Sequence, residues 1–486
     1  MKSKNITPLF IILAAIFLLF LIAFIIVPYD IADLTDVNDY SDTAKLFAGE
    51  YHAKHRTSHS LLYGLMLTPY VELTNNFFLL KFASAFWLSL LILSLYYISG
   101  KNKKALLLLV INPVFWYLSP WLSPLPLVSL LFLWSYFFIK KFDSKEKFKH
   151  LFFSGFLIGL ASALWETAFY FSFIFLLAFF YNKKLYHSIL FFMAVFIGMV
   201  PNLIVNQIIF DFPFYSLAKH FFAVLAFAIY GGAYGQGYSN PSFRSFIIIL
   251  LFIPFYFYLF FKKNNFKKYR KEVIFISLAL LFILTNPQLR LLILFTPLIL
   301  LLLGNELTIK QLKKQIFISL LLSLLTISPY LIQISHDTDA RSIDKVLGNF
   351  PNIEFYNTPH YLLIKSDLHE IEKDYPGQVF LVGNTNDDYG RLAHLYWGDN
   401  IKEFVSLEDY ELWLNKKTTI ASQRISSNAS QQFRREIWVE VGLGKNLNDR
   451  TNYEEIKYAI APNNNFKLDN FKLIKSYEKL SIFEKI

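Results

Sequence analysis

The first 334 residues alternate between long apolar runs and short polar connections. A helix needs about 20 mostly apolar residues to cross the ~30 Å hydrocarbon core of a bilayer. Helices that are apolar on every side are not expected on the surface of a soluble protein. The pattern therefore predicts a polytopic α-helical membrane protein with about eleven spans. The predicted spans lie at approximately 7–28, 77–99, 104–119, 121–140, 150–164, 166–181, 186–209, 243–261, 272–286, 288–304 and 314–334.

Two polar breaks between these runs are very short, at Ser119-Pro120 and at Trp165-Glu166, and they indicate either hairpins or broken helices. Two other connections are long, at about 29–76 and 210–242. Long connections with no function are uncommon in compact domains. The second holds an apolar piece that is too short to span and then the glycine-rich 231–238, which suits a mobile lid or an ordinary flexible connection.

The chain becomes soluble in character from about Ser335, so residues 1–334 and 335–486 are predicted to form two domains. Apolar stretches with strand character and amphipathic stretches with helix character alternate in the second part, which predicts a small α/β or α+β domain. The expected strands are Val379–Val382, Ile437–Val441 and Leu480–Phe483, and the expected helices are Asp388–Trp397 and Glu408–Leu414.

The distribution of charge favours a membrane topology over a nucleic-acid-binding surface. The net charge is +11, but from Ser335 onward there are 19 basic and 23 acidic residues. If the N-terminus is inside, the inside loops with their flanks hold 21 of the other 28 basic residues, whereas nine of the 13 acidic ones lie outside. An odd number of spans then places the C-terminal domain outside. We therefore predict a multi-pass protein of the plasma membrane with an extracytoplasmic soluble domain and no nucleic-acid partner.

Composition agrees, since 55% of the residues are apolar and only 17% are charged, against a usual ~25%. The absence of Cys excludes disulfides, thiolate metal sites and a cysteine nucleophile. Trp116, Tyr117, Trp121 and Trp165 fall at predicted outer boundaries, which is typical of an aromatic belt at the membrane interface.

The first long connection is strongly acidic. Five carboxylates lie within thirteen residues directly after the first span: Asp30, Asp33, Asp36, Asp39 and Asp42. A solvated polar loop explains them as well as a functional site does, by composition alone. A carboxylate cluster beside a cavity is also what a general base or a Mg²⁺ or Mn²⁺ site requires.

A spaced pattern follows these carboxylates. Asp36, Tyr40, Ala44 and Gly49 form Asp-x-x-x-Tyr-x-x-x-Ala-x-x-x-x-Gly, and His59-Ser60-Leu61-Leu62-Tyr63 comes later. This pattern resembles the first external loop of the GT-C superfamily of polyprenyl-phosphate-sugar glycosyltransferases, which includes protein O-mannosyltransferases and aminoarabinose transferases. The architecture resembles that superfamily over the whole chain: many spans, an acidic first loop and a small external C-terminal domain. The protein O-mannosyltransferase branch has adjacent Asp-Glu here, whereas this chain has Asp36-Val37-Asn38-Asp39.

The resemblance implies an enzyme that transfers a sugar, with inversion, from a polyprenyl-phosphate donor to a hydroxyl acceptor outside the membrane. A hexosyltransferase of the mannosyltransferase kind is the specific expectation. It also implies that Asp36, or Asp39 as a close second, is the catalytic base or a metal ligand. Two alternatives remain open: a transporter or flippase, and a non-catalytic assembly protein of the cell envelope.

A lipid phosphate needs a cationic partner, and few basic residues lie on the predicted outer side. Arg290 starts a span at the outer boundary, and the resemblance implies an Arg in a similar late position, so we expect Arg290 to bind the phosphate. An interfacial Arg that snorkels is the plain alternative. Lys219 and Arg244 flank the second long connection and are further candidates.

Residues for the acceptor or sugar are expected nearby. Glu166 lies between two apolar runs on the outer side, and an ionisable residue there is a functional candidate by default. His59, Tyr63 and Tyr40 join it as candidates for binding the acceptor or the sugar. His52, His55 and His59 would share one face of a helix, so His55 with Asp36 and Asp39 forms a candidate set of metal ligands.

Overall fold

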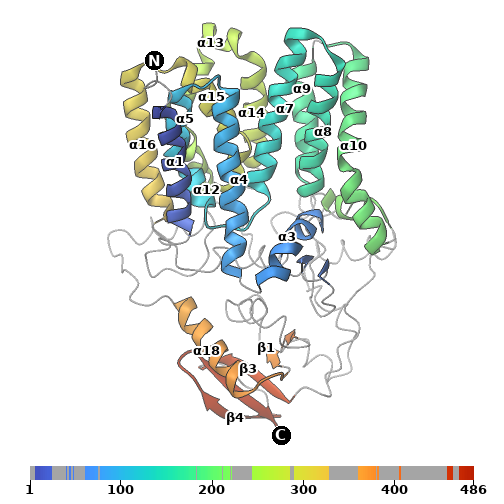
Figure 1. Ribbon diagram of the computed structural model, residues 1–486, viewed down its shortest axis with the longest axis vertical. Coiled ribbons are helices and arrows are strands. Elements are labelled where there is room, and N and C mark those ends of the chain that lie inside the picture. The colour runs from blue at the N-terminus through green and yellow to red at the C-terminus, as the bar shows by residue number, and fades with distance from the viewer. Residues whose placement is uncertain are drawn as a thin grey trace.

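The computed structural model describes a helical body and a small mixed sheet at opposite ends of an elongated molecule, with the N-terminus at the far end of the helical body from the sheet (Figure 1). The described residues are 6–23, 40, 43–44, 47–48, 61–74, 77–181, 183–210, 212–218, 220–221, 243–284, 289–327, 360–378, 380–382, 404–406, 457–463 and 470–486.

Helices make up the described part of the first domain. Those in the first half of the chain are α1 (Ile6–Leu21), α3 (Leu61–Thr74), α4 (Phe77–Ile98), α5 (Lys103–Val110), α6 (Pro113–Leu118), α7 (Leu125–Lys145), α8 (Phe148–Leu164), α9 (Ala168–Phe180) and α10 (Leu185–Phe210). Those that follow are α12 (Phe243–Phe252), α13 (Lys263–Lys268), α14 (Arg270–Leu284), α15 (Thr296–Glu306), α16 (Ile309–Ile327) and the 3₁₀ helices η3 (Phe255–Phe261) and η4 (Leu289–Leu294).

Three predicted spans are each two elements rather than one helix. The span at 104–119 is α5 and α6, that at 243–261 is α12 and η3, and that at 288–304 is η4 and α15. A proline stands at the start of the second element in each case: Pro113, Pro254 and Pro297. Proline disfavours helical conformation in the residue before it, and this preference accounts for the breaks. Asn112 reinforces the first break, since its side chain accepts a hydrogen bond from the Val114 amide and so starts a new helix.

Helix ends differ from the prediction where a local cap decides them. Helix α16 begins at Ile309 rather than near 314 because Thr308 and Gln311 form a reciprocal capping box. Helix α7 runs from Leu125 to Lys145 instead of 121–140 and ends where Glu146 adopts a left-handed φ of 49°. The predicted breaks near Ser119-Pro120 and Trp165-Glu166 are confirmed as the gaps between α6 and α7 and between α8 and α9. Helix α3 lies in the first long connection, where no helix was predicted.

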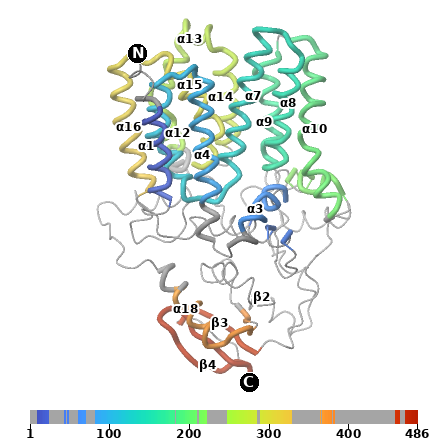
Figure 2. The backbone as a smooth tube through the Cα atoms, viewed as in Figure 1, coloured from blue at the N-terminus to red at the C-terminus, as the bar shows by residue number. Residues whose placement is uncertain are grey.

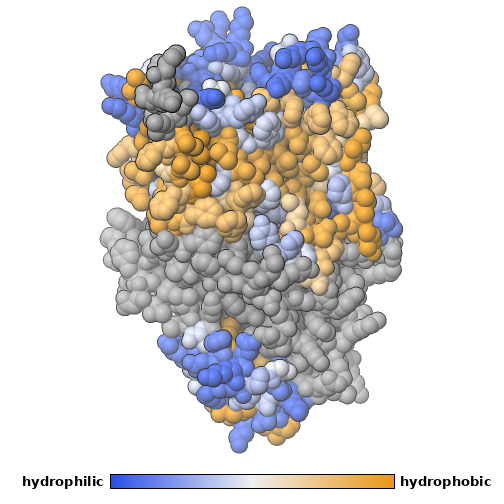
Figure 3. Space-filling view, viewed as in Figure 1, coloured by the Kyte–Doolittle hydropathy of each residue, from blue (hydrophilic) through white to orange (hydrophobic). Residues whose placement is uncertain are grey.

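The lysine-rich connections that were predicted to share one side come together at one end of the body. Asn102 donates to Asn305 at 2.9 Å, and the Lys104 ammonium donates to the Leu307 carbonyl at 2.7 Å. Lys268 and Tyr269 both donate to the Glu306 carboxylate, at 2.7 and 2.6 Å. Figure 3 shows hydrophilic residues gathered at this end, away from the sheet.

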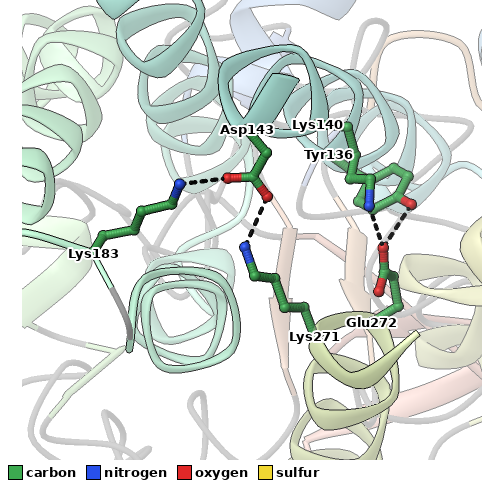
Figure 4. A network of polar contacts seen from close by, with 6 residues as sticks. All are labelled: Tyr136, Lys140, Asp143, Lys183, Lys271 and Glu272. Carbon is green, nitrogen blue, oxygen red and sulfur yellow. Dashed lines mark hydrogen bonds and ion pairs between the residues drawn. The ribbon is translucent and has the colours of Figure 1, made fainter. Parts of the chain in front are cut away.

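The same end holds a network of ion pairs, which we call the basic-end network (Figure 4). Asp143 of α7 pairs with Lys183 and with Lys271, each at 2.8 Å. The buried Glu272 of α14 accepts hydrogen bonds from the Tyr136 hydroxyl at 3.0 Å and from Lys140 at 3.1 Å. The network therefore ties three predicted inside connections to one another. The structure therefore agrees with the prediction that these connections lie on the same side. The orientation of the spans in a membrane stays a prediction.

On the face that Figure 3 shows, an apolar belt covers the helices next to the basic end. Large apolar side chains point outward from several helices, including Phe10 (70% exposed), Phe317 (65%) and Ile208 (75%). Monomeric soluble proteins rarely expose such wide apolar surfaces, so the belt is the surface expected of a body embedded in lipid. Helices Leu125–Lys145 and Leu185–Ile208 are long and apolar enough, by length and composition, to cross a membrane.

Small residues allow α8 and α10 to pack closely. A Cβ added at Gly159 would collide with the Val195 carbonyl oxygen, and one added at Gly198 would collide with the Phe156 carbonyl oxygen. Close approach of two backbones through glycine is the usual way in which helices pack in a membrane. The two helices form one side of the body, beside α7 and α9 (Figure 1).

The described residues after 359 form helix α18 (His360–Asp374) and five strands. The strands are β1 (Phe380–Val382), β2 (Phe404–Ser406), β3 (Tyr458–Pro462), β4 (Phe471–Ser476) and β5 (Leu480–Lys485). Their order is β2-β1-β3-β5-β4, with β1 parallel to both neighbours and β5 antiparallel to both of its own.

This mixed sheet confirms two of the predicted strands. Val379–Val382 corresponds to β1, and Leu480–Phe483 lies in β5. Asp367 of α18 is buried and accepts hydrogen bonds from the amides of Lys479 and Leu480, at 2.6 and 2.8 Å, which fixes the start of β5. The predictions for 388–397, 408–414 and 437–441 lie outside the described residues.

Candidate functional site

Helix α3 lies at the end of the helical body that faces the sheet (Figure 2), and described residues that precede it in the first long connection pack against it. The Thr68 hydroxyl of α3 donates to the Ala44 carbonyl at 3.3 Å. Gly64 lies so close to Thr43 that an added Cβ would overlap the threonine side chain. The Tyr40 ring meets the Tyr63 ring edge to face, with 4.9 Å between their centres. Tyr40, Thr43 and Ala44, which follow Asp36 and Asp39 in sequence, therefore pack against α3.

Helix α3 is in turn attached to the short connection between α6 and α7. Tyr63 is fully buried, and its hydroxyl donates to the Ser123 carbonyl at 3.0 Å. Burial raises the pKa of the Tyr63 phenol, so the hydroxyl keeps its proton and acts as a donor. The Ser123 amide donates to the Ser84 hydroxyl of α4 at 3.3 Å. Residues 119–124, which we call the tip, thus contact both α3 and α4.

Arg290 also contacts this tip. Its guanidinium carbon is 5.5 Å from the centre of the Trp121 ring, within the range of a cation–π interaction. Trp121 itself is buried and packs against Tyr117, with 4.9 Å between the ring centres. The Ser129 hydroxyl of α7 donates to the Ile293 carbonyl at 2.7 Å and so fixes the position of η4, which carries Arg290.

The aromatic residues near the tip are not a lipid-facing belt. Trp116, Tyr117 and Trp121 are buried within the protein, and the Trp116 indole donates to the Val110 carbonyl at 2.8 Å. The belt interpretation is therefore wrong for these three, because hydropathy alone does not tell whether an aromatic residue faces lipid or packs inside. Trp165 is half-buried.

Glu166 lies in a separate polar corner at the connection between α8 and α9. It is only 3% exposed. The neighbouring Thr167 hydroxyl lies 3.1 Å from the His220 Nε2, and the rings of Tyr170 and His220 are 5.8 Å apart. Glu166 is therefore a buried carboxylate whose sequence neighbour contacts an imidazole, and an ionisable residue buried in this part of the chain is a functional candidate.

The structure thus brings together Tyr40, Tyr63 and Arg290 of the predicted site residues around one tip, and places Glu166 in the polar corner. Asp36, Asp39, His55, His59 and Lys219 lie outside the described residues, and of Arg244 only the position in α12 is described. Within the described part of the chain no group of three His, Asp or Glu side chains converges as a metal site requires.

The hydroxyl residues that hold α3, α4 and the tip together were not identified from the sequence. Ser84, Thr68 and Ser123 are single hydroxyl residues within or beside apolar runs, and such residues give no pattern of their own. One feature of the sequence could have identified them: a polar side chain within an apolar run is buried and therefore needs a hydrogen-bond partner inside the fold. The partner's identity depends on contacts between residues far apart in sequence.

Comparison with known proteins places this fold. No protein-family model matches the chain, and no curated protein matches its sequence. The chain is similar to the crystal structure of ArnT from Cupriavidus metallidurans bound to undecaprenyl phosphate, with a TM-score of 0.63 over 100% of this chain and 99% of that one, at 10% identity. In the apo state the same protein gives a TM-score of 0.56 over 93% of both chains, again at 10% identity.

An oligosaccharyltransferase from Archaeoglobus fulgidus in the apo form is also similar, with a TM-score of 0.50 and 11% identity over 95% of this chain and 70% of that chain. ArnT is an aminoarabinose transferase, and both neighbours are GT-C glycosyltransferases. The resemblance predicted from the acidic first loop is therefore confirmed at the level of the fold.

Proposed function

We propose that this protein is a GT-C membrane glycosyltransferase that takes a sugar from a polyprenyl-phosphate carrier and transfers it to a hydroxyl acceptor on the outer face. The observation that carries the proposal is the fold, which matches over the whole chain that of a transferase bound to undecaprenyl phosphate. The placement of Arg290 supports it, because this cation lies beside Trp121 of the tip, which also accepts a hydrogen bond from Tyr63 of α3.

The proposed reaction is a direct displacement at the anomeric carbon. The acceptor oxygen forms a bond to that carbon while the bond from the carbon to the phosphate oxygen breaks. Asp36 or Asp39 takes the acceptor's hydroxyl proton, and the polyprenyl phosphate leaves with the electron pair. Attack from the face opposite the phosphate inverts the configuration. A hexose, with mannose as the first to test, is the specific form of the proposal.

Arg290 would neutralise the leaving phosphate. A planar guanidinium binds phosphate oxygens through two parallel hydrogen bonds, and the flat Trp121 face beside it restricts the orientations that it can take. Lys219 and Arg244 are the further candidates for this contact. Glu166 and His59 are proposed for the acceptor side, since Glu166 is a buried carboxylate directly before Thr167, which contacts His220.

A divalent cation is proposed as an optional partner of the acidic connection. Asp36, Asp39 and His55 offer carboxylate oxygens and an imidazole nitrogen, a set that suits Mn²⁺ or Mg²⁺. Such a cation would supply positive charge near the phosphate when bound. The dependence of the reaction on added EDTA and on restored Mn²⁺ tests this part separately.

The experiment that tests the function uses the purified full chain in nanodiscs. Radiolabelled undecaprenyl-phosphate sugars, each with a different sugar, are added together with crude acceptor membranes, and loss of label from the lipid is followed. Turnover of one donor supports the proposal and identifies the sugar. Folded protein that turns over and binds none of them would contradict the proposal and favour a transporter or an assembly protein.

A further inference from the structure

Where α7, α8 and α10 meet, the basic end carries an excess of positive charge. Some lysines of this end are paired, as Lys268 is with Glu306 at 2.7 Å. Within the residues that the structure describes, no ion pair engages the following five lysines, which we call the lysine cluster: Lys141, Lys145, Lys147, Lys149 and Lys184. Glu146 lies among them in sequence, so five positive charges and one negative charge give this region a net charge of +4.

The lysine cluster forms one surface, although its members come from three helices. The charges of its four members in α7 and at the start of α8 all act on the His150 side chain. The centre of the Phe148 ring of α8 lies 6.0 Å from that of Tyr186 and 5.9 Å from that of His187, both in α10. The Lys184 ammonium is 6.0 Å from the centre of the Tyr186 ring. The start of α10 therefore adds its lysine to those of α8, and the two helices lie side by side (Figure 1).

Exposed aromatic and apolar side chains adjoin these charges. Phe148, which lies between two of the lysines in sequence, is 53% exposed, and Tyr186 is exposed as well. Further along the same two helices, away from the basic end, Phe153 and Ile189 are also exposed. Aromatic side chains beside cations are typical of the level at which lipid headgroups lie. Cations and a lipid-facing apolar surface therefore meet at the lysine cluster.

The two parts of this surface match the two parts of an anionic phospholipid. Inorganic phosphate would use the lysines but leave the exposed apolar side chains uncovered. A zwitterionic lipid would cover those side chains, but its headgroup has no net charge to offer the lysines. A lipid with a negative headgroup uses both parts, because each Lys near a membrane surface adds to the attraction and the acyl chains cover the apolar side chains.

We propose that the lysine cluster is a binding site for an anionic phospholipid. The phosphate group lies among Lys147, Lys149 and Lys184, which are exposed beside the facing rings of α8 and α10, and the acyl chains follow the exposed side of these two helices. The site requires that the helical body is embedded in a membrane, and it does not depend on the proposed transfer reaction. Its lysines belong to the basic end, whereas Arg290 contacts the tip, so the two sites are distinct.

Helix α16 offers a matched control at the same end of the body. Lys310, Lys313 and Lys314 are exposed near its start. They come from one helix, and none of them lies over an aromatic ring of the described residues. Replacing these three lysines by Gln removes as much charge as replacing the three that are proposed to surround the phosphate. All six lysines are at the surface, so both triple variants are expected to fold.

The test measures binding of phosphatidylglycerol and of phosphatidylcholine with the same acyl chains to the purified full chain in detergent, by native mass spectrometry. We expect the wild type and the α16 triple variant to bind phosphatidylglycerol about tenfold more tightly. In the triple variant Lys147→Gln, Lys149→Gln and Lys184→Gln the preference should fall to within about twofold, whereas Arg at the same positions should keep it. Inorganic phosphate at the same concentration should not displace phosphatidylglycerol.

Each of the opposite results would overturn the proposal. A wild type without a preference between the two lipids, or a cluster variant that keeps the preference, would show that these lysines do not bind the headgroup. An equal loss in both triple variants would show attraction to the whole basic end and no site. Loss of the preference in the Arg variant would show an effect of packing and not of charge. Displacement by inorganic phosphate would indicate an anion site in place of a lipid site.

Discussion

The Arg290 guanidinium carbon lies 5.5 Å from the centre of the buried Trp121 ring. A cation held over an indole keeps its charge and a restricted set of orientations. The residue that the sequence marked as a candidate phosphate contact is therefore supported from one side by an aromatic face. The interaction leads to the first prediction.

Replacing Arg290 should weaken binding of the lipid-phosphate donor. Arg290→Lys keeps the charge but loses the planar fork, so we expect donor KM to rise by about tenfold, and Arg290→Ala to raise it further. Arg270→Ala is the matched control, because the Arg270 guanidinium lies 5.1 Å from the Tyr181 ring at the basic end. The donor KM of each variant, measured in steady-state transfer assays, tests whether Arg290 binds the donor. Equal effects of the Arg290 and Arg270 replacements would contradict a role in binding.

Glu166→Gln should impair use of the acceptor. The substitution preserves the shape of the side chain but replaces a buried carboxylate with an amide. We expect the acceptor KM to rise by about fivefold to tenfold, the loss expected when a hydrogen bond to a charged group is weakened, with donor KM unchanged. Glu272→Gln, another buried glutamate, controls for general effects at the basic end. Unchanged acceptor kinetics in Glu166→Gln would contradict this role.

The close packing of α8 and α10 predicts an effect on stability alone. Gly159→Leu forces a side chain against the Val195 carbonyl, and overpacking of this kind costs about 1–3 kcal/mol. Thermal unfolding in detergent should show a lower midpoint for this variant. Gly100→Asn is the comparison, since Gly100 has a φ of +64°, which Asn tolerates, and open space around it. Equal midpoints for Gly159→Leu and wild type would contradict the packing.

The basic-end network predicts a dependence of stability on pH. Partial burial alone would raise the pKa of Asp143, but hydrogen bonds and charge from Lys183 and Lys271 outweigh it and hold the pKa below its usual range. A lowered folded-state pKa stabilises the fold above the carboxyl's unfolded pKa, and this contribution is lost as pH falls through the folded value. Asp143→Asn should therefore reduce the free energy of unfolding at neutral pH by about 1 kcal/mol. Below the folded pKa of Asp143 the variant and wild type should converge, and a constant difference between them would count against the network.

The sequence predicted the features that depend on composition along the chain. Apolar runs predicted most helices. The distribution of lysines predicted that Lys104, Lys183 and Lys268 lie at the same end of the helical body. The sequence did not predict the breaks at Pro113, Pro254 and Pro297. An apolar run containing one proline has the same hydropathy whether the helix continues through it or restarts.

The site was predictable only in part, for a related reason. Arg290 was identified because few basic residues lie on the predicted outer side and because the resemblance implies an Arg in a similar late position. The Tyr63–Ser123 hydrogen bond joins residues 60 positions apart, and neither residue belongs to a periodic pattern. Contacts of this kind arise when α3 packs against the tip. Helix propensities describe single residues in their local sequence and do not predict such packing.

The central claim is that a carboxylate of the first connection drives sugar transfer from a polyprenyl phosphate. The most direct measurement is the single-turnover rate of transfer from the radiolabelled donor in nanodiscs for wild type, Asp36→Asn and Asp39→Asn, with Asp30→Asn and Asp42→Asn as controls from the same connection. We predict that Asp36→Asn, or else Asp39→Asn, lowers the rate by about a hundredfold or more while undecaprenyl phosphate still binds, and that the controls transfer at nearly the wild-type rate. Wild-type rates in both Asp36→Asn and Asp39→Asn would contradict the account.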